Sequence, residues 1–479
     1  MKNKTEKITR RQFIGTTSKI ALGATVATLA PGIITSKTKV LDRPNIFFVT
    51  ADQMRAQALG CMGNPQVQTP NFDRLASEGV LFTNAVSNFP VCTPARAMWL
   101  TGRYPTTTGV ISNDIQLPTE EITSAEVLKD MGYKTGYIGK WHLDGPDRKD
   151  FTPPGPRRQG FDYWAVANIC HNYFDAFYYT DSPEPIHVDG YQPDHETDLA
   201  IQFLQDHRKD KFFLNLHWGP PHDPYIAPEK YIKIYDPEKI QLRENVLQCV
   251  PEDIHFAIRK QIAAYYAAIS NIDWNMGRLM QALEDLGLAD NTIVIFTSDH
   301  GDMLFSLGVQ FKQWPYEESI RVPLIVRYPG RVKIGANYDS LISTMDLMPT
   351  ILSLCGAKIP KSVQGINFSK TILGEKGPDP EAALIMCVQP CARYNDRVGM
   401  LPWRGLRTKR YTYARFRHED WCLFDNEKDP YQRRSLFTTE YYKPEVKKLR
   451  DKLNAQLQSR LKQIGDSFDA PAFPKVRWH

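Results

Sequence analysis

The sequence predicts an α/β protein with a large, mostly parallel sheet sandwiched by helices, followed by a smaller α+β domain. The main observation is that short, continuous apolar runs alternate with helical patterns along the chain. Parallel strands covered on both faces lose the polar alternation of half-exposed strands. The second observation is composition: 479 residues, 42% hydrophobic and 24% charged, are typical of a globular chain and exclude collagen-like, coiled-coil and disordered proteins.

Four apolar runs are predicted to be buried strands, and a fifth run is a weaker candidate. The four lie at 45–50, 212–216, 292–296 and 323–326, and the weaker run lies at 134–138. Helical patterns lie between them, at 71–79 with an Asn cap, 124–131, 196–207 and 257–288, of which the last predicts a long helix with a break. This alternation predicts a parallel sheet with helices on both faces.

A segment rich in turn formers, 356–380, predicts a junction between two domains. Beyond it, 404–414 and 420–425 are predicted to be antiparallel strands, and 443–464 an amphipathic helix. We therefore predict a catalytic domain over residues 43–370 and a small C-terminal domain over residues 371–479.

The first thirty residues are predicted to be a Tat-type signal peptide. They hold six Lys or Arg and one Glu, which equals the net charge of the whole chain, +5. Arg10 and Arg11 form a twin-arginine pattern, followed by a mildly apolar stretch at 20–30. The pattern predicts export by the Tat machinery to the periplasm or the outside. The alternative is a disordered basic tail.

The rest of the chain carries no net charge, so it gives no electrostatic argument for nucleic-acid binding. It also has no run of 18 apolar residues, which argues against stable membrane insertion. The eight cysteines show no zinc-binding spacing, and only Cys387 and Cys391 are close enough in sequence to suggest a local disulfide.

Polar side chains follow four of the predicted strands. In chain order, these ends carry Asp52 and Gln53, Lys140 and His142, His217 and His222, and Asp299, His300 and Asp302. Ligands bind at the carboxyl ends of the strands in such sheets, so we expect a site at this rim. Carboxylate, amide and imidazole groups suit a divalent cation. Cap or turn roles are the alternative, and the favoured one for Asp302.

The stretch 90–102, Pro-Val-Cys-Thr-Pro-Ala-Arg-Ala-Met-Trp-Leu-Thr-Gly, contains the pattern C-x-P-x-R. It resembles the signature of the formylglycine-dependent, type I sulfatases of the alkaline phosphatase superfamily. The second signature of that family is matched at 132–142. Further similarity lies at 69–75, 298–302, 316–323 and 423–430. The resemblance covers most of the chain after the signal segment and implies an alkaline phosphatase-like fold.

The resemblance implies that a maturation enzyme oxidises Cys92 to formylglycine (3-oxoalanine), whose aldehyde hydrates to a geminal diol. One hydroxyl attacks the sulfur of a sulfate monoester, and the second expels sulfate afterwards. Sulfate monoesters are anionic and unreactive, so they need a strong nucleophile and nearby cations. The alternative for Cys92 is a buried, small apolar side chain.

The family resemblance also assigns the metal and the residues around it. The metal-ligand positions are matched by Asp52, Gln53, Asp299 and His300. Gln53 stands where many family members have a second Asp. The implied ion is Ca²⁺, with Mg²⁺ or Mn²⁺ as alternatives. Arg96 matches the residue that stabilises the diol.

Four further catalytic roles are implied in the same way. Lys140 and Lys312 match the lysines that clamp the sulfate. His142 matches the residue that helps deprotonate the hemiacetal, and His222 the general acid for the leaving oxygen. The stretch 305–311 departs from the family pattern, so an exposed loop lysine is the alternative for Lys312.

Substrate-binding residues are expected at His171, Asn172 and Tyr173, which can stack on and hydrogen-bond a sugar. A packed, Tyr-rich loop is the alternative. Arg393 and Arg397 can meet a carboxylate or a second sulfate, or simply face solvent.

Together these features predict an exported, metal-dependent sulfatase acting on a sulfated carbohydrate. A first alternative is a phosphonate monoester or phosphodiester hydrolase with the same formylglycine, because the Asp52-Gln53 pair also occurs in the choline sulfatase and phosphonate monoester hydrolase branches. A second alternative is an inactive, sulfatase-like binding protein in which Cys92 is never converted.

Overall fold

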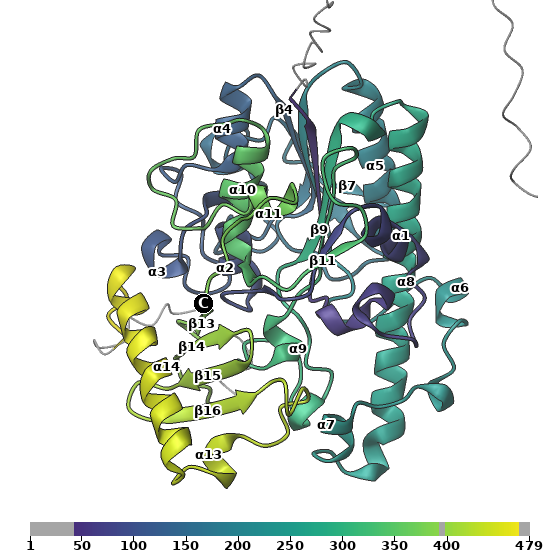
Figure 1. Ribbon diagram of the computed structural model, residues 1–479. Coiled ribbons are helices and arrows are strands. Elements are labelled where there is room, and N and C mark those ends of the chain that lie inside the picture. The colour runs from purple at the N-terminus through teal and green to yellow at the C-terminus, as the bar shows by residue number, and fades with distance from the viewer. Residues whose placement is uncertain (1–42, 392–397, 469–479) are drawn as a thin grey trace, which may run out of the picture. The chain divides into compact units, whose positions relative to one another are not determined.

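The computed structural model describes residues 43–391 and 398–468, and the chain from Arg43 onward forms one compact unit (Figure 1). The predicted signal peptide, and the candidate residues Arg393 and Arg397, lie outside the described residues. Within the described ranges, no helix combines the length and the apolarity that a membrane span requires.

The main sheet has eight strands, in the order β11-β2-β10-β9-β1-β8-β4-β5. Their bounds are β1 (Asn45–Ala51), β2 (Val80–Phe82), β4 (Lys134–Lys140), β5 (Tyr163–Ala167), β8 (Phe212–Trp218), β9 (Thr292–Ser298), β10 (Leu324–Arg327) and β11 (Ala336–Tyr338). Strands β9, β1, β8, β4 and β5 run parallel, which confirms the predicted α/β class. Strand β10 pairs antiparallel with both β9 and β2.

Helices cover both faces of this sheet (Figure 1). One face is packed by α1 (Pro70–Glu78), α5 (Gln192–Asp206) and α8 (His255–Asp285), and the other by α2 (Cys92–Thr101), α4 (Ser124–Asp130) and α10 (Leu347–Leu354). The central strand shows why its sequence is continuously apolar. Phe47 and Val49 point into the first layer, whereas Ile46 and Phe48 point into the second.

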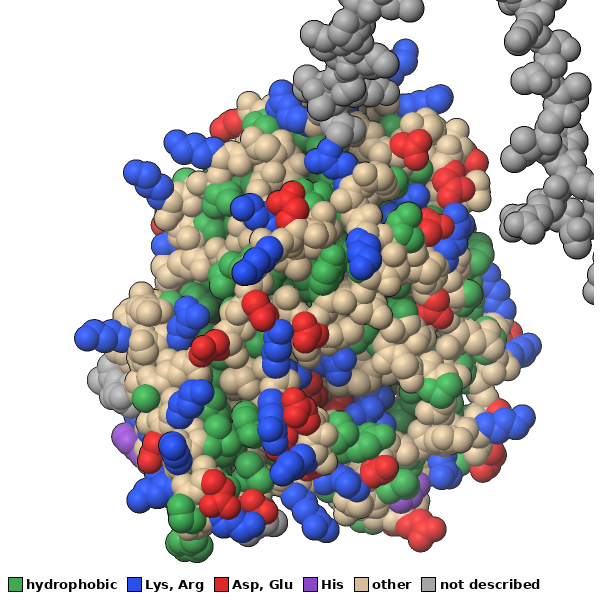
Figure 2. Space-filling model, in the orientation of Figure 1, with side chains coloured by type: hydrophobic (Ala, Val, Ile, Leu, Met, Phe, Trp, Pro, Cys, Tyr) green, Lys and Arg blue, Asp and Glu red, His purple; other side chains and the backbone are tan. Residues whose placement is uncertain are grey.

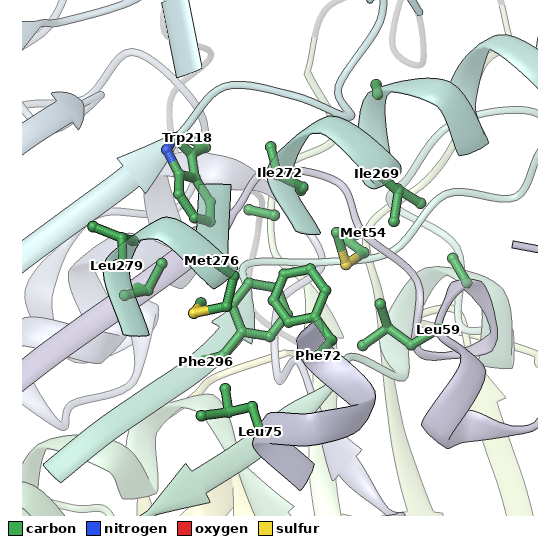
Figure 3. Close-up of a cluster of buried hydrophobic side chains, with 14 of the residues drawn as sticks. Met54, Leu59, Phe72, Leu75, Trp218, Ile269, Ile272, Met276, Leu279 and Phe296 are labelled. Atoms are coloured by element: carbon green, nitrogen blue, oxygen red, sulfur yellow. The ribbon is translucent and has the colours of Figure 1, made fainter. Parts of the chain in front are cut away.

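The core beneath α1 and α8 is drawn in Figure 3. Phe72 of α1 and Phe296 of β9 lie face to face at a tilt, with ring centroids 4.2 Å apart. Met276 and Ile272 of α8 pack beside them, and Trp218 of β8 closes the cluster. Burial of each large apolar side chain contributes about 1.5–3 kcal/mol, which holds the helices on the sheet.

Two local predictions were wrong. Helix α8 continues through 31 residues without a break, because its buried polar residues find partners: Asn271 and Asn275 both donate to Asp194. Helix α1 is not capped by Asn71. Its first backbone N–H groups donate to Asp273 of α8 instead, at 3.0 and 2.8 Å.

A second, antiparallel sheet follows, in the order β13-β14-β15-β16. Its strands are β13 (Ala382–Cys387), β14 (Trp403–Thr408), β15 (Tyr411–Arg415) and β16 (Asp420–Asp425), and helix α14 (Pro444–Gln463) packs against it. The predicted strand at 404–414 is a hairpin of two strands, and β13 was not predicted. Cys387 and Cys391 are free thiols, so the suggested disulfide was wrong. The boundary at residue 370 stays a prediction, because both sheets belong to one compact unit.

The remaining elements are short. They are β3 (Ala85–Val86), β6 (Phe177–Tyr178), β7 (Ile186–His187), β12 (Ile342–Ser343), α3 (Pro105–Thr108), α6 (Glu229–Ile232), α7 (Glu244–Leu247), α9 (Glu317–Ile320), α11 (Ser369–Ile372) and α13 (Leu436–Thr439).

Candidate active site

The four polar strand ends meet at one edge of the sheet because their strands are neighbours in it, in the order β9-β1-β8-β4. The last residue of β1, Ala51, is level with Ser298 of β9 and Trp218 of β8. Asp52 and Asp299 are therefore the next residues of two adjacent parallel strands. Lys140 ends β4, one residue beyond the Gly139–His217 pair.

Cys92 is the first residue of α2, and its buried thiol lies at the centre of this edge. Its Sγ atom is 2.8 Å from Lys312 Nζ, 3.3 Å from His300 Nε2 and 3.7 Å from Lys140 Nζ. Burial opposes ionisation, but the charges of Lys140 and Lys312 outweigh it and hold the pKa of the Cys92 thiol well below its usual range. The start of a helix favours negative charge in the same way.

Three further residues with metal-ligand atoms, two aspartates and one histidine, lie beside Cys92. Ligand atoms of Asp52, Asp299, His300 and Cys92 all lie within 4.8 Å of one another. The ring Nδ1 of His300 donates to the Gly301 carbonyl at 3.0 Å, and its Nε2 atom faces the carboxylates of Asp52 and Asp299. Burial raises the pKa of Asp52, but the charges of Lys140 and Arg96 overcome it and keep the carboxylate ionised.

Gln53 supplies an unsatisfied oxygen next to these groups. Its amide nitrogen donates to carboxylates of Asp302 (2.7 Å) and Asp223 (3.3 Å), so the orientation of the amide is determined. The Oε1 atom is buried and accepts no hydrogen bond from the described residues. Gln53 also has a positive φ of 65°, a strained conformation of the kind that gathers at functional sites. This donor set fits a cation that prefers oxygen.

Arg96 lies one helical turn after Cys92 and connects the two strand ends. Its Nη2 atom is 3.2 Å from both Asp52 Oδ2 and Asp299 Oδ2. Its Nη1 atom donates to the Lys140 carbonyl at 2.8 Å. Burial disfavours the guanidinium charge, but the two aspartates raise the pKa of Arg96 above its usual value.

His142 is held by Asp114, whose Oδ1 atom is 2.8 Å from His142 Nε2. Arg148 pairs with the other carboxylate oxygen of Asp114 at 2.6 Å. The opposite ring atom, His142 Nδ1, is buried without a hydrogen-bond partner among the described residues, and His142 lies close enough to Cys92 to lower the pKa of the thiol.

His222 and Lys312 contact each other directly, and Lys312 also contacts Cys92. Lys312 Nζ is 3.0 Å from His222 Nε2, while His222 Nδ1 donates to the Asp223 carbonyl at 2.7 Å. Lys312 is buried, so the alternative of an exposed loop lysine was wrong. Burial opposes its charge, but Cys92, Asp52 and Asp299 raise the pKa of Lys312 above its usual value.

The three residues expected at the substrate differ in their surroundings. His171 stacks on His222, with ring centroids 4.2 Å apart, and burial, helped by His222 and Lys140, lowers the pKa of His171 well below its usual value. Tyr173 is fully buried and donates its hydroxyl to the His222 carbonyl at 3.0 Å, so it packs under His222. Asn172 is exposed.

The family model described as Sulfatase matches residues 44–357 of this chain. The chain belongs to the sulfatase family. It is a type I sulfatase of the alkaline phosphatase superfamily and a sulfuric ester hydrolase, as the motif around Cys92 predicted. A second model, described as N-sulphoglucosamine sulphohydrolase, C-terminal, matches residues 307–460.

Several relatives of this sulfatase resemble it over most of their length. The Ulvan-active sulfatase of Formosa agariphila is 43% identical over 436 residues, which cover 89% of this chain and 82% of the relative. The Endo-4-O-sulfatase of Bacteroides thetaiotaomicron is 31% identical over 485 residues, with 89% and 93% covered. A solved structure in complex with its substrate, D-glucosamine-2-N,6-O-disulfate, superposes with a TM-score of 0.79 at 26% identity, covering 89% and 99%.

Several residues that position this sulfatase site were missed from the sequence. Asp114 orients His142, and Tyr225 donates to Asp302 at 2.6 Å, behind Gln53. Gln313 fixes the backbone beside Lys312, because its amide exchanges two hydrogen bonds with Cys391 in the C-terminal part of the chain. These contacts join segments that are distant in sequence, and no local pattern signals them.

Glu196 of this sulfatase is a buried acid close to Gly139 of β4, where an added Cβ would lie 3.2 Å from Glu196 Oε1. Burial raises its pKa to about 8, against the smaller opposing effects of Gln192 and Arg96. Between pH 4.5 and 8 the unfolded chain releases a proton that the folded chain keeps, so the free energy of unfolding falls as pH rises. The Glu196→Gln variant imitates the protonated acid and removes this loss.

We expect the Glu196→Gln variant to gain about 3 kcal/mol of stability relative to wild type between about pH 5 and pH 8. Denaturant unfolding of both proteins at the two pH values measures the gain. A stability difference that is the same at both values would contradict a protonated Glu196.

Proposed function

We propose that this sulfatase is exported and hydrolyses sulfate monoesters of a sulfated carbohydrate, with formylglycine made from Cys92 and a divalent cation, Ca²⁺ first. The observation that carries the proposal is the position of Cys92, whose Sγ contacts Lys140, Lys312 and His300 at once. Cations that surround a nucleophile suit an anionic ester, whose negative charge they stabilise.

The cation ligands in this proposal are Asp52, Gln53, Asp299 and His300. Two carboxylates, an amide oxygen and one imidazole form an oxygen-rich set, which favours Ca²⁺ over Zn²⁺, with Mg²⁺ or Mn²⁺ as alternatives. When bound, the cation neutralises negative charge on the sulfate group. Asp302 and Asp223 accept from the Gln53 amide nitrogen and so orient its oxygen, and Tyr225 in turn donates to Asp302.

In this proposal, the oxygens of hydrated formylglycine are bonded to the Cβ atom of residue 92, which carries Sγ in the unmodified cysteine. A hydrated formylglycine supplies one hydroxyl to attack sulfur and a second hydroxyl to release sulfate. Arg96 is held between Asp52 and Asp299 and orients residue 92. Lys140 and Lys312, on two sides of residue 92, bind the sulfate oxygens as compact charges.

Two histidines move protons in the proposed reaction. His222 donates a proton from Nε2 to the leaving oxygen, because its Nδ1 proton is engaged by the Asp223 carbonyl. Asp114 engages Nε2 of His142, so the Nδ1 atom of His142 accepts the proton from the second hydroxyl of residue 92. We further propose that His171, which stacks on His222, and the exposed Asn172 beside it in the chain contact the sugar.

The carbohydrate substrate is supported by the relatives: one is named for ulvan, another is an N-acetylglucosamine-6-O-sulfatase, and a solved relative holds a disulfated glucosamine. The proposed partners are the formylglycine-generating maturation enzyme and, from the twin-arginine pattern at Arg10 and Arg11, the Tat export machinery. We propose the periplasm or the outside as the location.

Sulfate release from a panel of glycans tests the proposal. The protein is co-expressed with a maturation enzyme and supplied with Ca²⁺, and sulfate is measured by ion chromatography. The panel holds ulvan, algal galactans and fucans, glycosaminoglycans and mucin glycans, with an aryl sulfate and phenylphosphonate beside them. We expect release from one glycan class, and a loss of about 100-fold or more when a chelator removes the cation.

Three other outcomes would count against this substrate class or this function. Turnover of the aryl sulfate alone rejects these glycans, and faster turnover of phenylphosphonate favours the phosphonate monoester hydrolase alternative. An unmodified thiol in the tryptic peptide that ends at Arg96, despite the maturation enzyme, supports the inactive binding protein.

A further inference from the structure

The outer side of the C-terminal part carries an aromatic and basic surface that the active site does not use. A cleft of about 370 Å³ lies between α13 and the start of α14. We call it the α13–α14 cleft, and its lining residues are Phe437, Tyr441, Tyr442, Val446, Lys447 and Arg450. In Figure 2, basic and hydrophobic side chains lie side by side at the lower left, where Figure 1 places these two helices.

Two aromatic side chains of this cleft are exposed, whereas Phe437 is partly buried against the core. Tyr442 is 95% exposed and Tyr441 is 44% exposed. The rings of Phe437, Tyr441 and Tyr442 form a connected series, with successive centroids 5.8 and 5.4 Å apart. Burial cannot explain this arrangement, since large aromatic side chains are normally covered. Exposed clusters of Tyr give rigid, amphipathic contact area to a ligand.

Positive charge is concentrated on the same helix. Helix α14 holds six Lys or Arg and two acidic residues, a net charge of +4, although the chain after residue 30 is neutral. Lys447 is exposed and forms no ion pair among the described residues. Arg450 also lines the cleft and pairs with Asp420 and Asp451, at 3.2 and 2.8 Å. The occupant that this charge complements is an anion.

We propose that the α13–α14 cleft is a second, non-catalytic binding site for a sulfated polysaccharide, a proposal that rests on the proposed function for the class of ligand. The tyrosines provide faces and hydroxyls for sugar rings, and Lys447 and Arg450 meet sulfate groups. A polymer that fills this site while another of its residues enters the active site is held at a high effective concentration, so its turnover rises without any new catalytic group.

Two variants test the cleft, in full-length protein carrying Cys92→Ala so that binding is measured without catalysis. The double variant Tyr441→Ala/Tyr442→Ala removes the aromatic faces, and Lys447→Glu reverses the charge at the cleft. Lys452→Glu is the matched control, because Lys452 is exposed on the same helix and does not line the cleft. Retardation in gels that contain each sulfated polysaccharide of the panel gives the affinities.

We expect the double Tyr variant to bind the retained polysaccharide about tenfold more weakly, and Lys447→Glu about threefold more weakly, with little change for Lys452→Glu. In matured protein without the Cys92→Ala substitution, the double Tyr variant should lose sulfate release from the polymer and keep hydrolysis of the aryl sulfate. Equal losses for Lys447→Glu and Lys452→Glu would mean unspecific charge attraction and overturn the proposal.

Two further results would also overturn it: no retardation of the parent protein by any sulfated polysaccharide, or loss of binding to anionic lipid vesicles in the Tyr variant without loss of binding to polysaccharide. Failure of the proposed function looks different, since wild-type matured protein would then release no sulfate from the panel while binding in the Cys92→Ala background is unaffected.

Discussion

Replacing Cys92 by alanine is expected to lower kcat for sulfate esters by about 10⁴-fold or more, because the nucleophile and its release chemistry disappear together. The surrounding charges of Lys140 and Lys312 remain, so binding of sulfate should persist and the loss should appear in kcat. Initial rates with an aryl sulfate, in protein co-expressed with a maturation enzyme, measure the effect.

The matched control is Cys249→Ala, which removes an exposed thiol and should leave the rate within about twofold. Mass analysis of the tryptic peptide ending at Arg96 accompanies both proteins and shows whether residue 92 of the parent is oxidised. Activity that survives in Cys92→Ala at more than a tenth of the parent rate would exclude residue 92 as the nucleophile.

Replacing His222 by alanine is expected to affect carbohydrate sulfates far more than aryl sulfates. A sugar alkoxide is a poor leaving group and needs a proton, so kcat on the glycan should fall about 10²–10³-fold. A nitrophenolate leaves without protonation, and the loss on nitrophenyl sulfate should stay near tenfold. Rates on the two substrates, measured under the same conditions, test this difference.

His207→Ala serves as control, because His207 is a partly exposed histidine that pairs with Asp210 and contacts none of the site residues named above. Equal losses on both substrates would indicate that His222 positions Lys312, which it contacts at 3.0 Å, and does not donate the proton. His171 stacks on His222, so the His171→Phe variant, which keeps a flat ring, is measured in the same experiment.

The residues of the central sheet were predictable because each signal is local. Runs such as 212–216 are apolar on both faces, as expected of strands covered by helices on both sides. Because parallel strands run in the same direction, their carboxyl ends lie along the same edge of the sheet. The positions of Asp52 and Asp299 directly after two such runs were therefore enough to place both at one site, and the residues around Cys92 indicated the chemistry. The observed register agrees, since Ala51 and Ser298 are level in adjacent strands.

Other parts of the site were decided by contacts between distant segments. The sequence contains Gln53, but the orientation of its amide comes from Asp223 and Asp302, with Tyr225 behind Asp302, and Oε1 is left without a hydrogen-bond partner among the described residues. The role of Tyr173 also changed: the sequence allowed it to face a sugar, and packing placed it under the His222 backbone. Side-chain orientation depends on which hydrogen-bond partners the fold brings near, and these partners have no fixed spacing in sequence.

The sequence by itself therefore determined the α/β class, the edge of the sheet at which the candidate site lies, and the membership of the sulfatase family. The tertiary structure decided which residues hold that site in shape: Asp114 behind His142, and Gln313 beside Lys312. The physical reason is the distance in sequence over which each kind of interaction acts. Apolar periodicity and a catalytic motif act within a few residues, whereas a buried polar group is satisfied by whatever partner the packed chain places beside it.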